Sequence, residues 1–82
     1  MLLGHLQFRT LPTKEQIDYV FTYGTYLARR SIVGFGVHLY HLNDFFCEVW
    51  VCQTFKQARL TRTFTSAGQL APYADLIQLP PL

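Results

Sequence analysis

Charged side chains are scarce in this sequence, and cysteines and long apolar runs are scarce as well. Aspartate, glutamate, lysine and arginine make up 15% of the 82 residues, against about 25% in an average protein. Half of the residues are apolar and 16% are aromatic, so some apolar surface must stay exposed or be covered by a partner. Self-association is the first expectation from composition.

The absence of other features narrows the function classes. The net charge of +2 is small for a dedicated nucleic-acid-binding domain, in which lysine and arginine cluster strongly. No apolar run approaches the roughly 18 residues of a membrane span, and the start of the chain lacks the charged region of a signal peptide. We therefore expect a soluble, cytoplasmic protein that does not bind a membrane and for which nucleic acid is not the expected partner.

The two cysteines, Cys47 and Cys52, predict neither a disulfide nor a metal site. Both lie in one predicted strand at an odd spacing, so their side chains point to opposite faces. Two free thiols in a reducing compartment are the expected state. Zinc requires four converging nitrogen or sulfur ligands. The side chains of His38 and His41, like those of the two cysteines, are expected to point to opposite faces of the sheet. No metal ligand, cofactor-binding residue or catalytic residue is predicted.

Hydrophobic spacing predicts a helix near the start of the chain. Thr13 and Gln16 form a capping-box pattern, and apolar residues recur at helical spacing from Ile17 to Gly24. Glycine readily adopts the left-handed conformation that ends helices, so the favoured reading ends the helix at Gly24. The alternative continues it to Arg30.

Short strands and a second helix follow. Pro72 is tolerated only in the first turn of a helix, which either places the start of the second helix near 69–71 or leaves a kink in a longer helix. Residues 1–11 are read as an edge strand or a flexible arm. The expected strands are Thr25–Arg30, Phe35–His41, Phe45–Cys52 and Ala58–Phe64.

The predicted fold class is α+β. The element order is α-β-β-β-β-α, or α-β-β-β-α if the first helix is long. Either order predicts a two-layer sandwich, in which an antiparallel β-meander of three or four strands carries two helices on one face. Residues 1–82 form a single domain with its core domain at 13–79. The expected core is Phe21, Val37, Leu39, Cys47, Val49, Val51, Leu60, Phe64, Leu70 and Ile77.

The site prediction rests on the hairpin around Asn43-Asp44. Paired residues lie on the same side of a sheet, and a two-residue loop would pair Leu39 with Glu48. An unpaired buried carboxylate costs several kcal/mol, so we expect a three-residue loop with Asp44 in the left-handed region. The expected pairs are then Leu39 with Cys47, Val37 with Val49, His38 with Glu48, and Tyr40 with Phe46.

With that register, one aromatic face lies away from the helices. It is the predicted interaction surface, and a second copy of the chain or another protein is the expected partner. The function that follows is a non-enzymatic protein-interaction or structural module. The surface consists of Tyr40, Phe46, Trp50, His38, Glu48 and Arg59.

Two alternatives stay open. One is a weak nucleic-acid-binding domain that uses Trp50 and nearby arginines, since the shorter element order resembles that of double-stranded RNA-binding domains. Those domains have a lysine-rich start to the second helix, whereas this chain has Ser66-Ala67-Gly68-Gln69. The other alternative is a small enzyme in which Glu48 orients His38 as a general base, although no nucleophile accompanies that pair.

One further pattern spans residues 13–79. Its segments are Gly24 to Ala28, Leu39 to Trp50, Phe64 to Ser66, and Pro72-Tyr73. In this pattern the chain resembles small uncharacterised bacterial single-domain proteins. The resemblance implies one compact unit and carries no activity.

Overall fold

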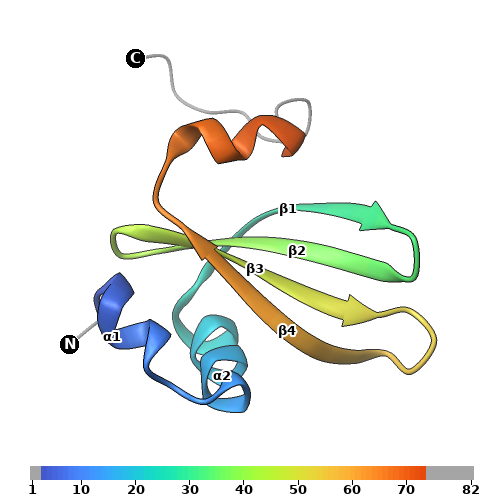
Figure 1. Cartoon of the computed structure of the whole chain (residues 1–82), viewed down its shortest axis with the longest axis horizontal. Helices are drawn as coiled ribbons and strands as arrows, with labels where there is room; N and C mark the ends of the chain where they lie inside the picture. The colour runs from blue at the N-terminus through green and yellow to red at the C-terminus, as the bar shows by residue number, and fades with distance from the viewer. Residues whose placement is uncertain (1–2, 74–82) are drawn as a thin grey trace.

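The computed structural model describes residues 3–73, and a four-stranded antiparallel sheet is its centre (Figure 1). The strands follow one another as a meander in the order β1-β2-β3-β4. This confirms the α+β class and the four-strand meander. The core position predicted for Ile77 lies outside the described residues. The strands are β1 (Thr25–Ile32), β2 (Phe35–Leu42), β3 (Phe45–Cys52) and β4 (Gln57–Phe64).

The N-terminal segment is neither an edge strand nor an arm in its described part, so that prediction is wrong. It forms the short helix α1 (His5–Arg9), whose first turn is tied by a hydrogen bond from the Gly4 N–H to Gln7 Oε1 at 2.9 Å. Phe8 from this helix is fully buried. The alternation of apolar and polar residues that suggested a strand is too short to distinguish the two periods.

Helix α2 (Thr13–Tyr23) ends immediately before Gly24. Gly24 is not left-handed there, because its φ is −79° and its ψ is 150°. A Cβ at this position would lie 2.6 Å from the carbonyl oxygen of Val20 and 3.2 Å from the Tyr40 side chain. Glycine is required here for close approach of the chain to β2, not for a positive φ.

The second predicted helix is a 3₁₀ helix, η1 (Ala67–Tyr73), with Pro72 inside it. It begins earlier than the expected start at 69–71. The Ser66 carbonyl accepts the Gln69 N–H at 3.1 Å, an i to i+3 bond of the 3₁₀ type. Neither Gly68 nor Pro72 favours a longer α-helix here.

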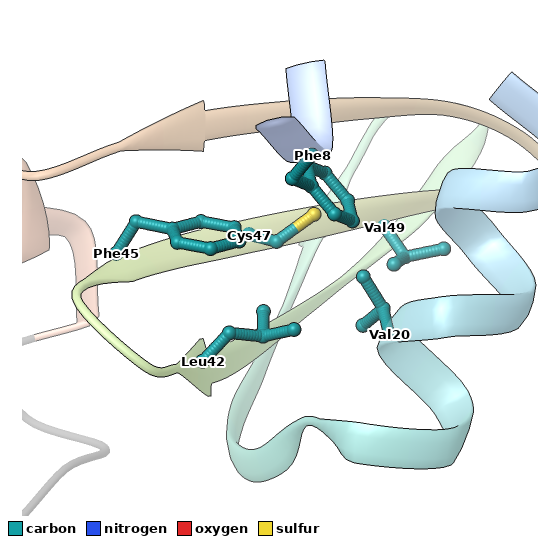
Figure 2. Close-up of a cluster of buried hydrophobic side chains, with 6 residues drawn as sticks. All are labelled: Phe8, Val20, Leu42, Phe45, Cys47 and Val49. Carbon is teal, nitrogen blue, oxygen red and sulfur yellow. The ribbon is translucent and has the colours of Figure 1, made fainter. Parts of the chain in front are cut away.

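The sheet is covered on both faces, so the predicted two-layer arrangement with both helices on one face is wrong. Figure 1 shows α1 and α2 on one side of the sheet and η1 on the other. The reason is that β2 and β3 carry apolar residues at both alternating sets of positions, and each set needs cover. One core, drawn in Figure 2, is Phe8, Val20, Leu42, Phe45, Cys47 and Val49. The opposite core is Ala28, Leu39, Phe64, Leu70 and Tyr73.

Of the predicted core residues within 3–73, six are buried, Val51 is half-buried and two are exposed. Phe21 is 55% exposed and Leu60 is 42% exposed, so their assignment to the core is wrong. Phe21 lies one residue beyond Val20, which faces the sheet, and it therefore lies on the flank of α2. Leu60 belongs to an edge strand, where one neighbour is missing.

Candidate functional site

The register of the β2–β3 hairpin differs from the prediction. Leu42 pairs with Phe45 across the two-residue loop Asn43-Asp44, and Leu39 consequently pairs with Glu48. The three-residue loop is therefore wrong, and so is a left-handed Asp44, since Lys56 is the non-glycine residue with a positive φ within the described chain. The four predicted pairs are wrong as well: Leu39 with Cys47, Val37 with Val49, His38 with Glu48, and Tyr40 with Phe46.

Glu48 is buried, with 4% of its surface exposed, because it has partners outside the hairpin. Its Oε2 accepts a hydrogen bond from the Tyr73 hydroxyl at 2.5 Å and lies 3.3 Å from Arg30 Nη2. The prediction assumed an unpaired carboxylate, whose burial is costly. A carboxylate that is paired and hydrogen-bonded avoids most of that cost.

The structure does not bring the predicted interaction residues together. The sheet register places them on opposite faces, because side chains alternate along a strand. The predicted aromatic surface and the predicted His38–Glu48 pair therefore do not form. Phe46, Glu48 and Trp50 point to the face that η1 covers, His38 and Tyr40 point to the α2 face, and Arg59 lies where the β3–β4 register shifts.

The residues on the η1 face are packed rather than open. The Trp50 ring is half-buried and meets Phe35 edge-on at 5.7 Å between ring centroids. Phe46 lies between His41 and Phe64, at centroid distances of 5.1 and 5.4 Å. Trp50 and Phe46 are therefore in contact with neighbouring rings on this face.

A polar cluster of Arg30, Glu48 and Tyr73 links β1, β3 and η1. The Arg30 guanidinium also lies over the Tyr73 ring, 5.2 Å from its centroid. Burial opposes the charged form of Arg30, but the hydrogen bonds to Tyr73 and Glu48 raise its pKa above the usual value. Burial and the bond to Glu48 raise the pKa of Tyr73. The cluster keeps Tyr73 protonated as a donor and holds η1 on the sheet.

A pocket of about 210 Å³ opens beside this cluster, between the sheet and η1. Arg62 also lines it, from the position opposite Glu48 on β4. Because Oε2 of Glu48 already has two partners, the carboxylate is occupied by structural contacts. We interpret this pocket as the rim of a structural cluster rather than as a catalytic centre.

An aromatic strip lies on the α2 face, at the junction of α2, β1 and β2. It consists of Phe21, Tyr26 and Tyr40. Tyr40 is central, with its ring centroid 5.9 Å from that of Phe21 and 5.5 Å from that of Tyr26. Phe21 and Tyr26 are 55% and 51% exposed. The strip continues to His38, whose ring is 6.0 Å from that of Tyr26.

The two cysteines are free and differ in their environment. Burial raises the pKa of the Cys47 thiol to about 12. The pKa of Cys52 is lowered, first by the backbone N–H of Phe55 and further by Thr54 and Arg59. Cys47 is thus an inert core thiol.

Raising the pH is expected to destabilise the fold through Cys47. A folded-state pKa of about 12 against 9.0 means that the unfolded thiol ionises first, so stability is complete below pH 9 and falls as the pH rises towards 12. Between pH 8 and 10.5 this group removes about 2 kcal/mol. Urea unfolding of the wild type and of Cys47→Val measures the difference. A Cys52→Ser control that behaves like Cys47→Val would contradict the assignment.

The described residues contain no cluster of three or more histidine, cysteine, aspartate or glutamate side chains suited to a metal ion. Within residues 3–73, no helix is both long enough and apolar enough to cross a membrane.

Sequence reasoning missed Phe21, Tyr26, Arg30 and Tyr73. Tyr26 and Arg30 lie on β1, and their faces depend on the register shift between Tyr26 and Ala28. That irregularity has no sequence signal. For Tyr73 a signal did exist, because a tyrosine after a short apolar segment is suited to donate to a buried acceptor.

Fold and surface together define a small domain with a four-stranded antiparallel meander, covered on both faces, and an exposed aromatic strip at one edge. Comparison of the chain with protein-family models, curated proteins and solved structures gave no match. The resemblance to small bacterial single-domain proteins stays a prediction.

Proposed function

We propose that this chain is a non-enzymatic protein-interaction module that associates with a second copy of itself through the aromatic strip of Phe21, Tyr26 and Tyr40. The observation that carries the proposal is the contact of three rings from three different elements, two of which are more than half exposed. Aromatic residues are enriched at the centres of protein interfaces, where they supply much of the binding energy.

The packing within the strip favours a protein partner over a nucleic acid. Bases stack on open ring faces, whereas the Tyr40 ring is contacted by both Phe21 and Tyr26. Trp50, on which the nucleic-acid alternative depended, lies on the opposite face of the sheet from Tyr40. No observation favours the alternative enzyme, since His38 and Glu48 are also on opposite faces.

Charge at the two ends of the strip favours a second copy as the partner. Asp18 precedes Phe21 by one turn of α2, so both lie on one side of the helix, and Arg29 is the neighbour of His38 across the β1–β2 ladder. Two copies related by a twofold axis place the acidic end of one strip against the basic end of the other. An isologous interface needs this self-complementarity.

The open edge of β1 does not compete as the contact. Edge strands pair with other chains when they are long and regular. The β1 edge has a register shift between Tyr26 and Ala28 and carries Arg29 and Arg30. Bulges and charges of this kind discourage edge pairing, which favours the aromatic strip over the β1 edge as the self-association surface.

A cytoplasmic location belongs to the same proposal. It is supported by the two free cysteines, because thiols stay unpaired in reducing compartments.

Sedimentation velocity over a range of protein concentrations tests self-association. The wild type is expected to be dimeric at micromolar concentrations, and Phe21→Ser is expected to shift the equilibrium towards monomer by at least about tenfold. The matched control is Phe55→Ser, because Phe55 is also an exposed phenylalanine, at 64%, but lies in the turn between β3 and β4.

The control should leave the dimer intact. A wild type that stays monomeric throughout the concentration range would refute the proposal. So would a dimer that Phe21→Ser and Tyr26→Ser leave unchanged. A dimer lost equally in Phe55→Ser would place the interface elsewhere.

A further inference from the structure

A second pocket, of about 220 Å³, lies at the opposite end of the sheet from the β2–β3 turn. The turn after β1 and the turn after β3 meet there, joined by a hydrogen bond from the Gln53 N–H to the Gly34 carbonyl at 3.0 Å. Three basic side chains line the pocket: Arg29, His38 and Lys56.

Two of these side chains converge over Gly36. A Cβ placed on Gly36 would lie 3.5 Å from both Nε and Nη2 of Arg29, and 3.7 Å from Nε2 of His38. The guanidinium and the imidazole therefore approach the same point from β1 and β2. Because glycine has no side chain, the space above its Cα is left to their polar atoms.

The third basic side chain is carried by a residue with unusual backbone geometry. Lys56 has a φ of +56°, in the left-handed region that costs most residues about 1–2 kcal/mol. Glycine or asparagine adopts this conformation more readily. Lys56 ends the turn between β3 and β4, where short hairpin loops often hold a left-handed residue, and it lines the pocket from that turn.

The positive charges in this pocket are not neutralised by the residues that line it. No carboxylate is among the lining residues of the described chain. Burial, followed by the charge of Arg29, lowers the pKa of His38, which is the response expected where a like charge is close. An anion placed between these groups would reverse that effect.

We propose that Arg29, His38 and Lys56 form a binding site for a phosphate dianion, either free phosphate or the phosphate group of a monoester. The two permanent cations, Arg29 and Lys56, match the two negative charges. The planar guanidinium of Arg29 can donate two parallel hydrogen bonds to phosphate oxygens, and the ammonium group of Lys56 supplies a compact positive charge. His38 donates from Nε2 when it is protonated.

This site goes beyond the self-association proposed above, although Arg29 takes part in both. The two ideas have different readouts: oligomeric state tests the first, and anion binding tests the second. Cys52 is the remaining titratable residue that lines the pocket, and the Tyr26 ring lies beside His38.

Heteronuclear NMR with sodium phosphate, at ionic strength kept constant with chloride, tests the site. Saturable shifts are expected at the amides of Gly36 and His38, and the titration midpoint of the His38 ring should rise when phosphate is bound. Arg29→Gln and Lys56→Gln should each weaken binding by about tenfold or more, since each removes a charge-assisted contact.

The matched control is Arg9→Gln, because Arg9 is exposed on α1 and its loss changes the net charge equally. It should bind phosphate as the wild type does. Shifts that grow without saturation, or an equal loss in Arg9→Gln, would overturn the site. Repeating the titration with phosphoserine distinguishes the sources: tighter binding than phosphate indicates a monoester, and equal binding indicates phosphate itself.

Discussion

Phe8→Ala is expected to lower the free energy of unfolding by about 3–5 kcal/mol. Phe8 is fully buried, and its ring lies 5.1 Å from that of Phe45 and 5.8 Å from that of Tyr19. Removing the ring leaves a cavity between α1, α2 and β3, in the core drawn in Figure 2. Urea unfolding followed by circular dichroism measures the change.

The control for Phe8 lies in the same helix. Leu6 is 76% exposed, and Leu6→Ala should change stability by no more than about 0.5 kcal/mol. If Phe8→Ala were equally mild, α1 would be a loosely attached arm, as the sequence first suggested. Should Phe8→Ala fail to fold, Phe8→Leu keeps part of the side-chain volume and is expected to cost about 1–2 kcal/mol.

Glu48→Ala is expected to lower the free energy of unfolding by about 3 kcal/mol. The substitution leaves the Tyr73 hydroxyl and the Arg30 guanidinium without their shared acceptor, Oε2 of Glu48. Nε of Arg30 is buried and has no hydrogen-bond partner among the described residues, so the guanidinium depends on this carboxylate. Because Arg30 is a quarter exposed, the expected loss lies at the lower end of the range for a broken buried pair.

Two further variants separate the contribution of the Tyr73 hydrogen bond from the general effect of removing a carboxylate. Tyr73→Phe removes one hydrogen bond to Glu48 and should cost about 1–2 kcal/mol. The control Asp44→Ala removes an exposed carboxylate from the loop before β3 and should be nearly neutral. If Glu48→Ala and Asp44→Ala had the same small effect, the cluster would not be what holds η1 on the sheet.

The strands were predictable because their signals are local. The turn residues around Gly34 and Asn43-Asp44 separate runs that are rich in β-branched and aromatic side chains. Helix α2 was predictable for the same reason, since its apolar spacing repeats every three to four residues. Each of these patterns spans no more than about a dozen residues, so it does not depend on contacts between distant parts of the chain.

The candidate site was not predictable in the same way. Its assignment depended on whether the loop before Phe45 has two residues or three, and a change of one residue exchanges every side chain between the faces of the sheet. The burial argument that chose three residues left out Arg30 and Tyr73, which lie 18 and 25 positions away from Glu48. The element order separately predicted both helices on one face, although β2 and β3 carry apolar residues on both faces.

The sequence by itself determined the strand-forming segments after Gly34, their antiparallel order and the start of the helix before them, because alternation and turn residues act over short distances. The structure decided that the helix ends before Gly24 and that the sheet has four strands. The tertiary structure alone decided which face each side chain occupies. That choice depends on the partners that a buried carboxylate finds on β1 and η1, and on which helix covers each face. Those contacts join segments that are far apart along the chain, so they cannot be predicted from a local sequence pattern.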